Sequence, residues 1–290
     1  MGRQKRSANT YTKINTIFYR DENNIIMPYD ELVMPELEYL RNCKFDATEK
    51  IDGTNIRIEV HRNCEIGKFK NEVENIEFEA ITKIEWHVEY KGKTDNSVIP
   101  NMLETYLKET YPEDKVLMAL GLTKTMLPDS SEAEAKGWIC ETHGVKHFTP
   151  EIPTMYTLYG EGYGVKVQAC GANYLSNSNS FIGFDVKVDN KYLLRANMLD
   201  VFNKLGCPTV PYIGQLTIDE AIEYVKHGFK SAISENTDFL AEGLVLKSPC
   251  ELLTRNGERI CFKVKTRDWN KYFAAYGTYD KVEQKRNPNI

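Results

Sequence analysis

The clearest strand pattern in the chain is TEKIDGTNIRIEV, residues 48–60. Apolar residues alternate with polar ones from Ile56 to Val60, and a period of two is typical of a strand that buries one face. An Asp-Gly pair, which favours a turn, directly precedes this strand. Lys50 therefore lies beside a turn, at the edge of a strand, and its presence there needs a chemical reason.

Similar alternation predicts strands at FDVKV (184–188), GLVLK (243–247) and ICFKVK (260–265). Helical periodicity predicts helices at NMLETYLKET (101–110), NMLDVFNKLG (197–206) and TIDEAIEYVKHGF (217–229). The last of these opens with a capping box formed by Thr217 and Glu220. Together these segments predict a strand-rich α+β fold.

Composition sets broad limits on the class of protein. With 290 residues, of which 41% are hydrophobic, the chain can form one large domain or two small ones. A net charge of -5 argues against coating nucleic acid by bulk charge, although a local basic groove remains open. The 7 cysteines form no CxxC pair and fit reduced thiols better than zinc ligands or disulfides. No signal peptide or membrane span is visible, so we expect no membrane partner and a location in the cytoplasm, or in the host cytoplasm for a viral protein.

Two strand patterns carry charged residues that allow two interpretations each. Lys263 and Lys265 project from one face of their strand, where two ammonium groups repel each other. They form either a solvated face or a site for a shared polyanion. Glu242 and Lys247 flank the strand pattern at 243–247, either as ordinary charged ends or as part of a site.

Other motifs are equally open when taken singly. Glu161 lies between glycines in YGEGYG (159–164), which indicates either a turn or a close approach to a ligand. The GKT sequence around Lys93 lacks the earlier glycine of a phosphate loop. Phe184 in FIGFDV (181–186) fits core packing or a site. Neither HExxH nor a serine elbow occurs, so zinc protease and triad hydrolase chemistry have no support.

The joint order of these motifs resembles that of covalent nucleotidyltransferases. The series is KIDG at Lys50, GKT at Lys93, YGEGYG at Glu161, FIGFDV at Phe184, EGLVLK at Glu242 and KVK at Lys263. It is most similar to the RNA ligase 5-like family of ATP-dependent RNA ligases and more distantly to the RNA ligase 2 family, over about residues 45–268. The resemblance implies antiparallel β-sheets flanked by helices, with a nucleotide pocket between the sheets.

The resemblance also implies a role for each motif residue. Lys50 would attack the α-phosphorus of ATP and carry AMP. An ordinary lysine has a pKa of about 10.4, so its surroundings must remove the proton from the ammonium group before it can attack. Nearby cations, here Lys263 and Lys265 with a bound metal, disfavour the charged amine. The other implied roles are adenine stacking by Phe184, ribose binding by Glu161, adenine-edge reading by Glu49 with the backbone of Ile51, phosphate or metal-water contacts by Asp52 and Asn55, metal positioning through water by Glu242, phosphate contacts by Lys247, Lys263 and Lys265, and a ribose or phosphate contact by Lys93.

The implied reaction uses ATP and Mg²⁺ or Mn²⁺ to join RNA ends. Lysyl-AMP forms first, AMP then moves to an RNA 5′-phosphate, and a 3′-hydroxyl finally displaces AMP. The chain departs from the family at Lys93, where an arginine is usual and a lysine cannot make the same bidentate contact.

We expect a single nucleotidyltransferase domain over residues 1–290, with a helical elaboration at about 98–137 and no appended OB or helical C-terminal domain. A monomer of this kind would rely on a basic groove or a protein partner for RNA affinity. The alternatives are a minimal ATP-dependent DNA ligase, a non-catalytic nucleotide- or RNA-binding module, and an unrelated α+β protein whose motifs coincide by chance.

Overall fold

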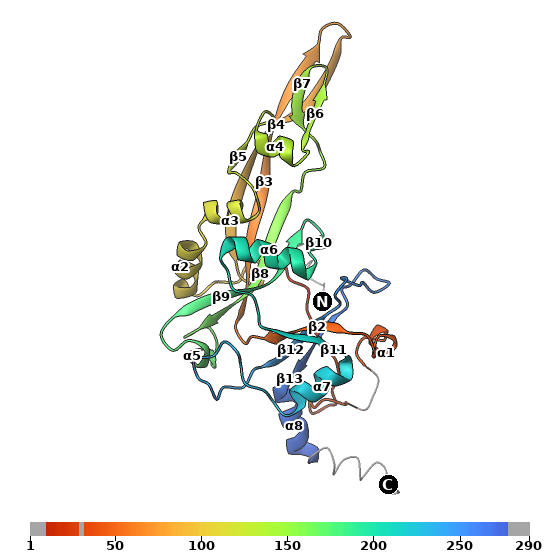
Figure 1. Cartoon of the computed structure of the whole chain (residues 1–290), viewed down its shortest axis with the longest axis vertical. Helices are drawn as coiled ribbons and strands as arrows, with labels where there is room; N and C mark the ends of the chain where they lie inside the picture. Colours follow the sequence, from red (N-terminus) through yellow and green to blue (C-terminus); the bar gives the residue numbers. More distant parts are fainter. Residues whose placement is uncertain (1–9, 29–31, 278–290) are drawn as a thin grey trace. The chain divides into compact units, whose positions relative to one another are not determined.

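The computed structural model describes residues 10–28 and 32–277, which form two compact units (Figure 1). The first unit consists of Thr54–Gly162 and Asn179–Thr209, with Tyr11. The second consists of Thr12–Gly53, Tyr163–Ser178 and the described residues from Val210 onward. Each unit contains its own sheet.

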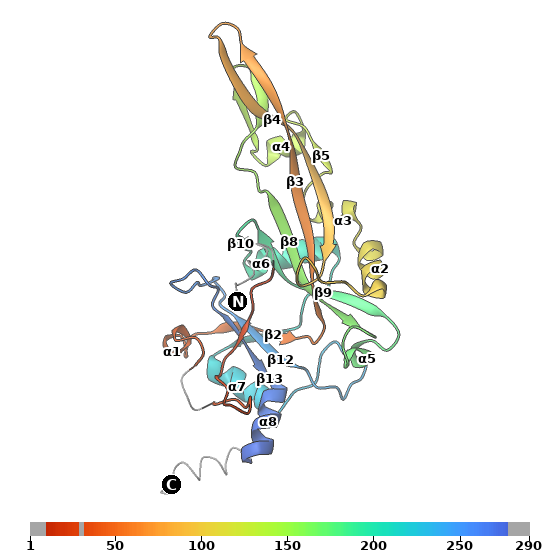
Figure 2. The same cartoon turned by 180° about the vertical axis from the view of Figure 1, so that it is seen from behind.

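The sheet of the first unit follows the order β10-β9-β8-β3-β4-β7-β6, and β5 pairs with β4. Its strands are β3 (Thr54–Asn71), β4 (Ile76–Lys91), β5 (Thr125–Met126), β6 (Ile139–Thr142), β7 (Val145–Phe148), β8 (Met155–Gly164), β9 (Asn179–Val188) and β10 (Lys191–Tyr192). Its helices are α2 (Asn101–Thr110), α3 (Glu113–Ala119), α4 (Ser131–Ala135) and α6 (Arg195–Leu205). Figure 2 shows α2 and α3 beside β4, one strand of the long β3–β4 hairpin.

The start of β3 differs from the half-buried strand that its alternation predicts. Every residue from Ile56 to Val60 is buried, including Arg57 and Glu59, which expose 0% and 1% of their surface. The two charged side chains form an ion pair of 2.6 Å, and this pairing allows the polar face to be buried as well.

The second unit has a sheet of order β1-β13-β12-β2-β11, in which all neighbouring strands are antiparallel except β1 and β13. Its strands are β1 (Asn15–Thr16), β2 (Phe45–Lys50), β11 (Tyr212–Leu216), β12 (Gly243–Lys247) and β13 (Cys261–Lys265). Its helices are α1 (Glu36–Tyr39), α5 (Gly171–Tyr174), α7 (Ile218–Lys226) and α8 (Thr266–Tyr276). One face of the sheet forms an apolar core with α7 and α8, to which Leu244, Leu246, Phe262 and Trp269 belong.

The predicted α+β class with largely antiparallel sheets is confirmed. The capping box of α7 is present, with Thr217 and Glu220 each bonded to the other's backbone N–H. This helix ends at Lys226, earlier than its pattern predicts, and Gly228 follows with a left-handed φ of 75°. Helices α2, α3 and α4 lie within residues 98–137. Among the described residues, no helix is long and apolar enough to cross a membrane.

Candidate active site

Strand pairing in the second unit brings Lys50 next to Glu242. Lys50 is the last residue of β2 and lies opposite Gly243 of β12. On the other side of β12, Gly243 lies opposite Lys265 of β13. Glu242 directly precedes Gly243, so its side chain reaches a lysine on each neighbouring strand.

Gly243 itself has no room for a side chain. Its φ is 148°, and a Cβ added there would lie 2.0 Å from the carbonyl oxygen of Val264. The close approach of β13 thus requires glycine at this position, and it keeps Glu242 near both lysines.

Glu242 bridges two ammonium groups. Lys50 Nζ lies 2.5 Å from Oε2 of Glu242, and Lys265 Nζ lies 2.5 Å from Oε1. Burial by itself raises the pKa of Glu242, but Lys50 and Lys265 together outweigh it and hold the pKa below its usual value. The carboxyl group is therefore ionised, and it orients both lysines.

Lys263 adds a further positive charge on the same face as Lys265. Burial is the largest cause that lowers the pKa of Lys263 to about 8, followed by repulsion from Lys265 and Lys50, with a smaller contribution from Lys13. Three lysines thus surround one carboxylate, and the excess positive charge suits a polyanion such as a nucleotide triphosphate.

Lys247 lies at the far end of β12, four residues beyond Gly243 and about 13 Å along the strand. The even spacing places both residues on one face of the sheet. Lys247 therefore extends the positively charged face, and its contact with phosphate stays a prediction.

Glu49 lies on the opposite face of β2 from Lys50, because neighbouring residues of a strand alternate. Its buried carboxylate accepts hydrogen bonds from Ser231 Oγ at 2.5 Å and from the Ala232 N–H at 2.9 Å. Burial raises the pKa of Glu49, although both hydrogen bonds oppose the shift. The side chain thus anchors the loop at 231–232, and its contact with the adenine edge stays a prediction.

The turn after Lys50 is held by residues 168–174. The backbone N–H of Asp52 donates to Tyr174 Oη at 3.1 Å, and Gln168 Nε2 donates to the carbonyl of Gly53 at 3.1 Å. Cys170 Sγ donates to Oδ2 of Asp52 at 3.2 Å. Burial, supported by this contact with Asp52, raises the pKa of Cys170 to about 12. Because the thiol stays protonated, it holds the Asp52 carboxylate as a hydrogen-bond donor.

Buried Ile51 lies in the same turn, directly after Lys50. The backbone contact of Ile51 with adenine and the metal-water contact of Asp52 stay predictions.

Asn55 and Glu161 are neighbours in the first unit, opposite each other on β3 and β8. Oδ1 of Asn55 is buried and has no hydrogen-bond partner among the described residues. A buried acceptor of this kind needs a donor, which a water or a ligand would supply. The predicted contact of Asn55 with a ligand is compatible with this orphan oxygen.

The glycines that flank Glu161 make room for neighbouring side chains. A Cβ at Gly160 would lie 2.2 Å from a ring carbon of Phe181, and one at Gly162 would lie 2.4 Å from Cδ2 of Leu103. Their small size therefore serves packing within the unit. The ribose contact of Glu161 stays a prediction.

Phe184 lies on β9, and its partly exposed ring meets Tyr11 edge-on, with 5.0 Å between the ring centroids. Lys93 is exposed in the loop that follows β4. Both residues belong to the first unit together with Asn55 and Glu161, and their contacts with nucleotide stay predictions.

Four residues that contribute to the site of the second unit are not predicted by any sequence motif: Lys13, Gln168, Cys170 and Tyr174. They occur in no motif and act through tertiary contacts with Lys263 or with the turn at 52–53. No local pattern in the sequence marks any of the four.

The RNA ligase family profile matches residues 44–265, which is more than half of the chain. The chain belongs to the RNA ligase family. No match to the chain was found among curated proteins. The match includes all of the motif residues from Lys50 to Lys265.

Solved structures similar to the chain include RNA ligases of Naegleria gruberi. A lysine mutant with AMP and manganese has a TM-score of 0.48 and 15% identity, covering 91% of this chain and 57% of that chain. An arginine mutant with ATP and manganese has a TM-score of 0.49 and 16% identity, covering 95% of this chain and 59% of that chain. The chain thus spans less than two thirds of the length of these ligases.

The residues of the second unit fit a divalent cation that arrives with phosphate. Both oxygens of Glu242 already contact lysines, so direct coordination would displace an ammonium group. Magnesium keeps several of its waters when it binds protein, and Glu242 can hold such an ion through water.

Proposed function

We propose that this member of the RNA ligase family is an ATP-dependent enzyme that joins RNA 3′-hydroxyl and 5′-phosphate ends through a lysyl-AMP intermediate. The observation that carries the proposal is the bridge from Lys50 through Glu242 to Lys265, with Lys263 beside it. The positive charge of these lysines suits the phosphates of ATP. Lys263 and Lys265 supply it close to Lys50, the lysine of the KIDG motif.

In the first step, Nζ of Lys50 attacks the α-phosphorus of ATP, a P–N bond forms, and the bond to pyrophosphate breaks. The attacking amine must first give up a proton, which Oε2 of Glu242, 2.5 Å from Nζ, is placed to accept. Lys263 and Lys265 offset the negative charge that develops on the phosphates. A bound magnesium or manganese ion would supply Lewis-acid stabilisation of the same phosphates.

In the second step, an oxygen of the RNA 5′-phosphate attacks the adenylate, the P–N bond to Lys50 breaks, and a 5′-5′ pyrophosphate linkage forms. In the third step, the 3′-hydroxyl attacks the RNA phosphorus and AMP leaves. Lys50 is covalently modified only between the first and second steps.

We assign supporting roles to the remaining motif residues. The proposed contacts are adenine with Phe184, Glu49 and Ile51, ribose with Glu161, phosphate or metal water with Asp52 and Asn55, and phosphate with Lys93 and Lys247. The burial of Oδ1 of Asn55 without a partner supports a ligand or water contact at that residue.

We propose RNA as the partner, bound by a monomer through local basic surface or together with a second protein. The net charge of -5 means that any such surface is local. RNA affinity that depends on lysine–phosphate contacts falls steeply as salt increases, because bound counterions are released.

The test is incubation of the full chain with α-labelled ATP and magnesium or manganese, followed by denaturing electrophoresis and peptide mapping. We expect label on Lys50, no label in Lys50→Ala, and release of label when a 5′-phosphorylated RNA nick is added and sealed. Lys44→Ala is the matched control, because Lys44 precedes the same strand and pairs with Glu220 at the surface.

Equal labelling of Lys50→Ala and the parent would disprove the mechanism. Sealing of an all-DNA nick as fast as a matched RNA nick would favour the minimal DNA ligase. A folded protein that takes no label with any nucleotide would instead be a binding module.

A further inference from the structure

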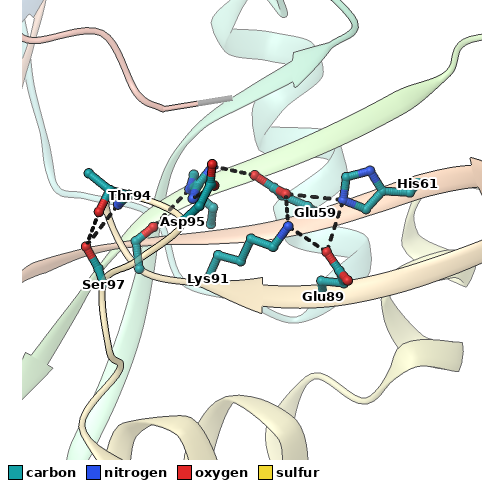
Figure 3. Close-up of polar contacts among 9 residues, drawn as sticks. Glu59, His61, Glu89, Lys91, Thr94, Asp95 and Ser97 are labelled. Atoms are coloured by element: carbon teal, nitrogen blue, oxygen red, sulfur yellow. Dashed lines mark hydrogen bonds and ion pairs between the residues drawn. The ribbon is translucent and has the colours of Figure 1, made fainter. Parts of the chain in front are cut away.

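Among the described residues of the first unit, the most deeply buried ion pair is Arg57–Glu59, and Arg57 contacts the loop that carries Lys93. Figure 3 shows Glu59 close to the loop residues Thr94, Asp95 and Ser97. Arg57 exposes 0% of its side chain and Glu59 exposes 1%. Burying two charges is costly unless each is paired and fully hydrogen-bonded. The reaction proposed above assigns neither residue a role, so their burial needs another explanation.

Arg57 uses its guanidinium group to grip the loop at two points. Nε donates to the carbonyl of Gly92 at 2.9 Å, and Nη2 donates to Oδ1 of Asp95 at 2.8 Å. Lys93 lies between these two anchors. The backbone around Lys93 is thus tied to a buried group in the middle of the sheet.

Glu59 fixes the guanidinium group from the other side. Its Oε1 accepts from Nη1 of Arg57 at 2.6 Å, and its Oε2 lies 3.0 Å from Lys91 Nζ and 3.2 Å from His61 Nε2. Because Arg57 and Glu59 are both enclosed, the guanidinium plane has little freedom to turn. The donors on Nε and Nη2, which bond to Gly92 and Asp95, therefore define where the loop lies.

The loop also closes on itself. The hydroxyl of Ser97 accepts from the N–H of Thr94 at 3.0 Å and lies 2.7 Å from the Thr94 hydroxyl. A Cβ at Gly92 would lie 2.7 Å from Cβ of Ser97, so the turn is tight. These contacts leave the side chain of Lys93 exposed on an otherwise anchored turn.

A metal site is the competing interpretation, because Glu59, His61 and Glu89 have ligand atoms within 4.8 Å of one another. Lys91 Nζ, however, lies 3.0 Å from Oε2 of Glu59 and 2.6 Å from Oε2 of Glu89. The position that a cation would take is thus filled by an ammonium group, as Figure 3 shows. The cluster is better explained as a support for the loop.

We infer that Arg57 and Asp95 are positioning residues that fix the loop around Lys93 for contact with the nucleotide. The inference rests on the proposed function, because Lys93 is there assigned to phosphate. A lysine carries a point charge on a flexible stem, and anchoring the backbone on both sides of Lys93 limits the volume that its ammonium group can reach. The anchored loop compensates for the lysine that stands where the family usually has an arginine.

The test is a double-mutant cycle on self-adenylylation of the full chain, with the rate measured against ATP concentration. Asp95→Ala removes an anchor whose side chain is 51% exposed, so little of the core is disturbed. We expect the ATP concentration for half-maximal rate to rise about tenfold, since small misplacements of a positioning group cost one to two orders of magnitude. Asp95→Asn keeps an acceptor oxygen for Arg57 and should recover most of the loss.

The cycle separates positioning from a general structural effect. If Asp95 acts through Lys93, Asp95→Ala adds less than about twofold in a Lys93→Ala background. Glu85→Gln is the matched control, because Glu85 is an ion-paired carboxylate on β4, the strand that precedes the loop, with 2.7 Å between its Oε1 and Lys83 Nζ. We expect no change.

Two results would overturn the inference, and they are distinguishable. An effect of Asp95→Ala that is equally large with and without Lys93, or no effect at all, disproves the positioning role while Lys50 labelling of the parent still supports the ligase. No labelling of the parent removes the proposed function, and the inference is lost with it.

Discussion

The two units each bury a carboxylate among cations, yet they balance charge differently. In the first unit, Glu59, Glu89 and Asp95 face the two cations Arg57 and Lys91. In the second unit, the single carboxylate of Glu242 faces Lys50 and Lys265, with Lys263 nearby. The first cluster has no charge left for a polyanion, whereas the second has an excess of positive charge.

This difference in charge balance separates the cluster that we infer to support the loop from the cluster that we propose to bind nucleotide. Buried charges that are fully paired hold backbone segments in place, and they leave no net charge to attract an ionic ligand. Lysines crowded around one carboxylate repel one another until an anion arrives, and the lowered pKa of Lys263 reflects this crowding together with burial.

The largest effect on stability is expected from Glu59→Gln. This change leaves the Arg57 guanidinium buried with its closest negative partner neutralised, so the free energy of unfolding falls by about 3 kcal/mol. Urea denaturation at pH 7 measures the loss. Glu85→Gln is the surface control, for which we expect no measurable change in the free energy of unfolding.

The second prediction concerns the same Glu-to-Gln exchange at Glu242. Lys50 exposes 21% of its side chain and can turn toward solvent, so Glu242→Gln is expected to cost less stability than Glu59→Gln. Added inorganic pyrophosphate should raise the melting temperature of Glu242→Gln by more than it raises that of the parent. It should raise that of Glu59→Gln by about as much as that of the parent, because Glu59→Gln leaves the lysines around Glu242 unchanged. A larger loss at Glu242 than at Glu59 would contradict the contrast between the clusters.

A smaller effect is expected from the titration of Lys263, whose pKa falls from 10.5 to about 8 on folding. Between these values the unfolded chain binds more protons, so the contribution of Lys263 to stability rises with pH and is least favourable below about pH 8. If ATP binds as proposed, its phosphates should restore the charged form of Lys263. Binding near pH 8.5 should therefore take up a proton, and affinity should fall about tenfold toward pH 9.5.

Calorimetry of ATP binding in two buffers with different ionisation enthalpies measures this proton uptake. Lys263→Met is the control and should take up fewer protons than the parent. Identical binding heats for the parent in both buffers at pH 8.5 would show that Lys263 does not titrate at the site.

The smallest effect is expected from Glu89→Gln, at the rim of the first cluster. Glu89 exposes 52% of its side chain and contacts Lys91 and His61. Exposed ion pairs contribute little, so the free energy of unfolding should change by less than about 0.5 kcal/mol in the same urea experiment. A loss of stability as large as that of Glu59→Gln would mean that Glu89 and Glu59 stabilise the fold as members of one cooperative cluster.

Sequence periodicity predicts well the part of the site that one sheet face organises. Lys263 and Lys265 are two residues apart, so a strand must place them on one face, and the alternation at 243–247 places Glu242 at a strand end. The same logic fails for Arg57 and Glu59, because alternation distinguishes two faces without telling whether the polar one is covered.

Contacts between segments that are distant in the sequence are a second feature that sequence patterns do not predict. Cys170 and Tyr174 hold the turn at Asp52 across more than 100 residues of sequence, and no local pattern records such a contact. The glycines beside Glu161 likewise pack against Phe181 and Leu103, a cause that is invisible until the neighbouring elements are placed.

The central position of β12 between β2 and β13 has a consequence for synthesis on the ribosome. Lys50 emerges early, but its partner Glu242 follows 192 residues later, and the strand with Lys263 and Lys265 comes later still. Pairings of such long sequence separation form late in folding. A nascent chain therefore carries its KIDG lysine without Glu242, Lys263 and Lys265 beside it until β13 has left the exit tunnel, so the bridge between the lysines forms only after synthesis has passed Lys265.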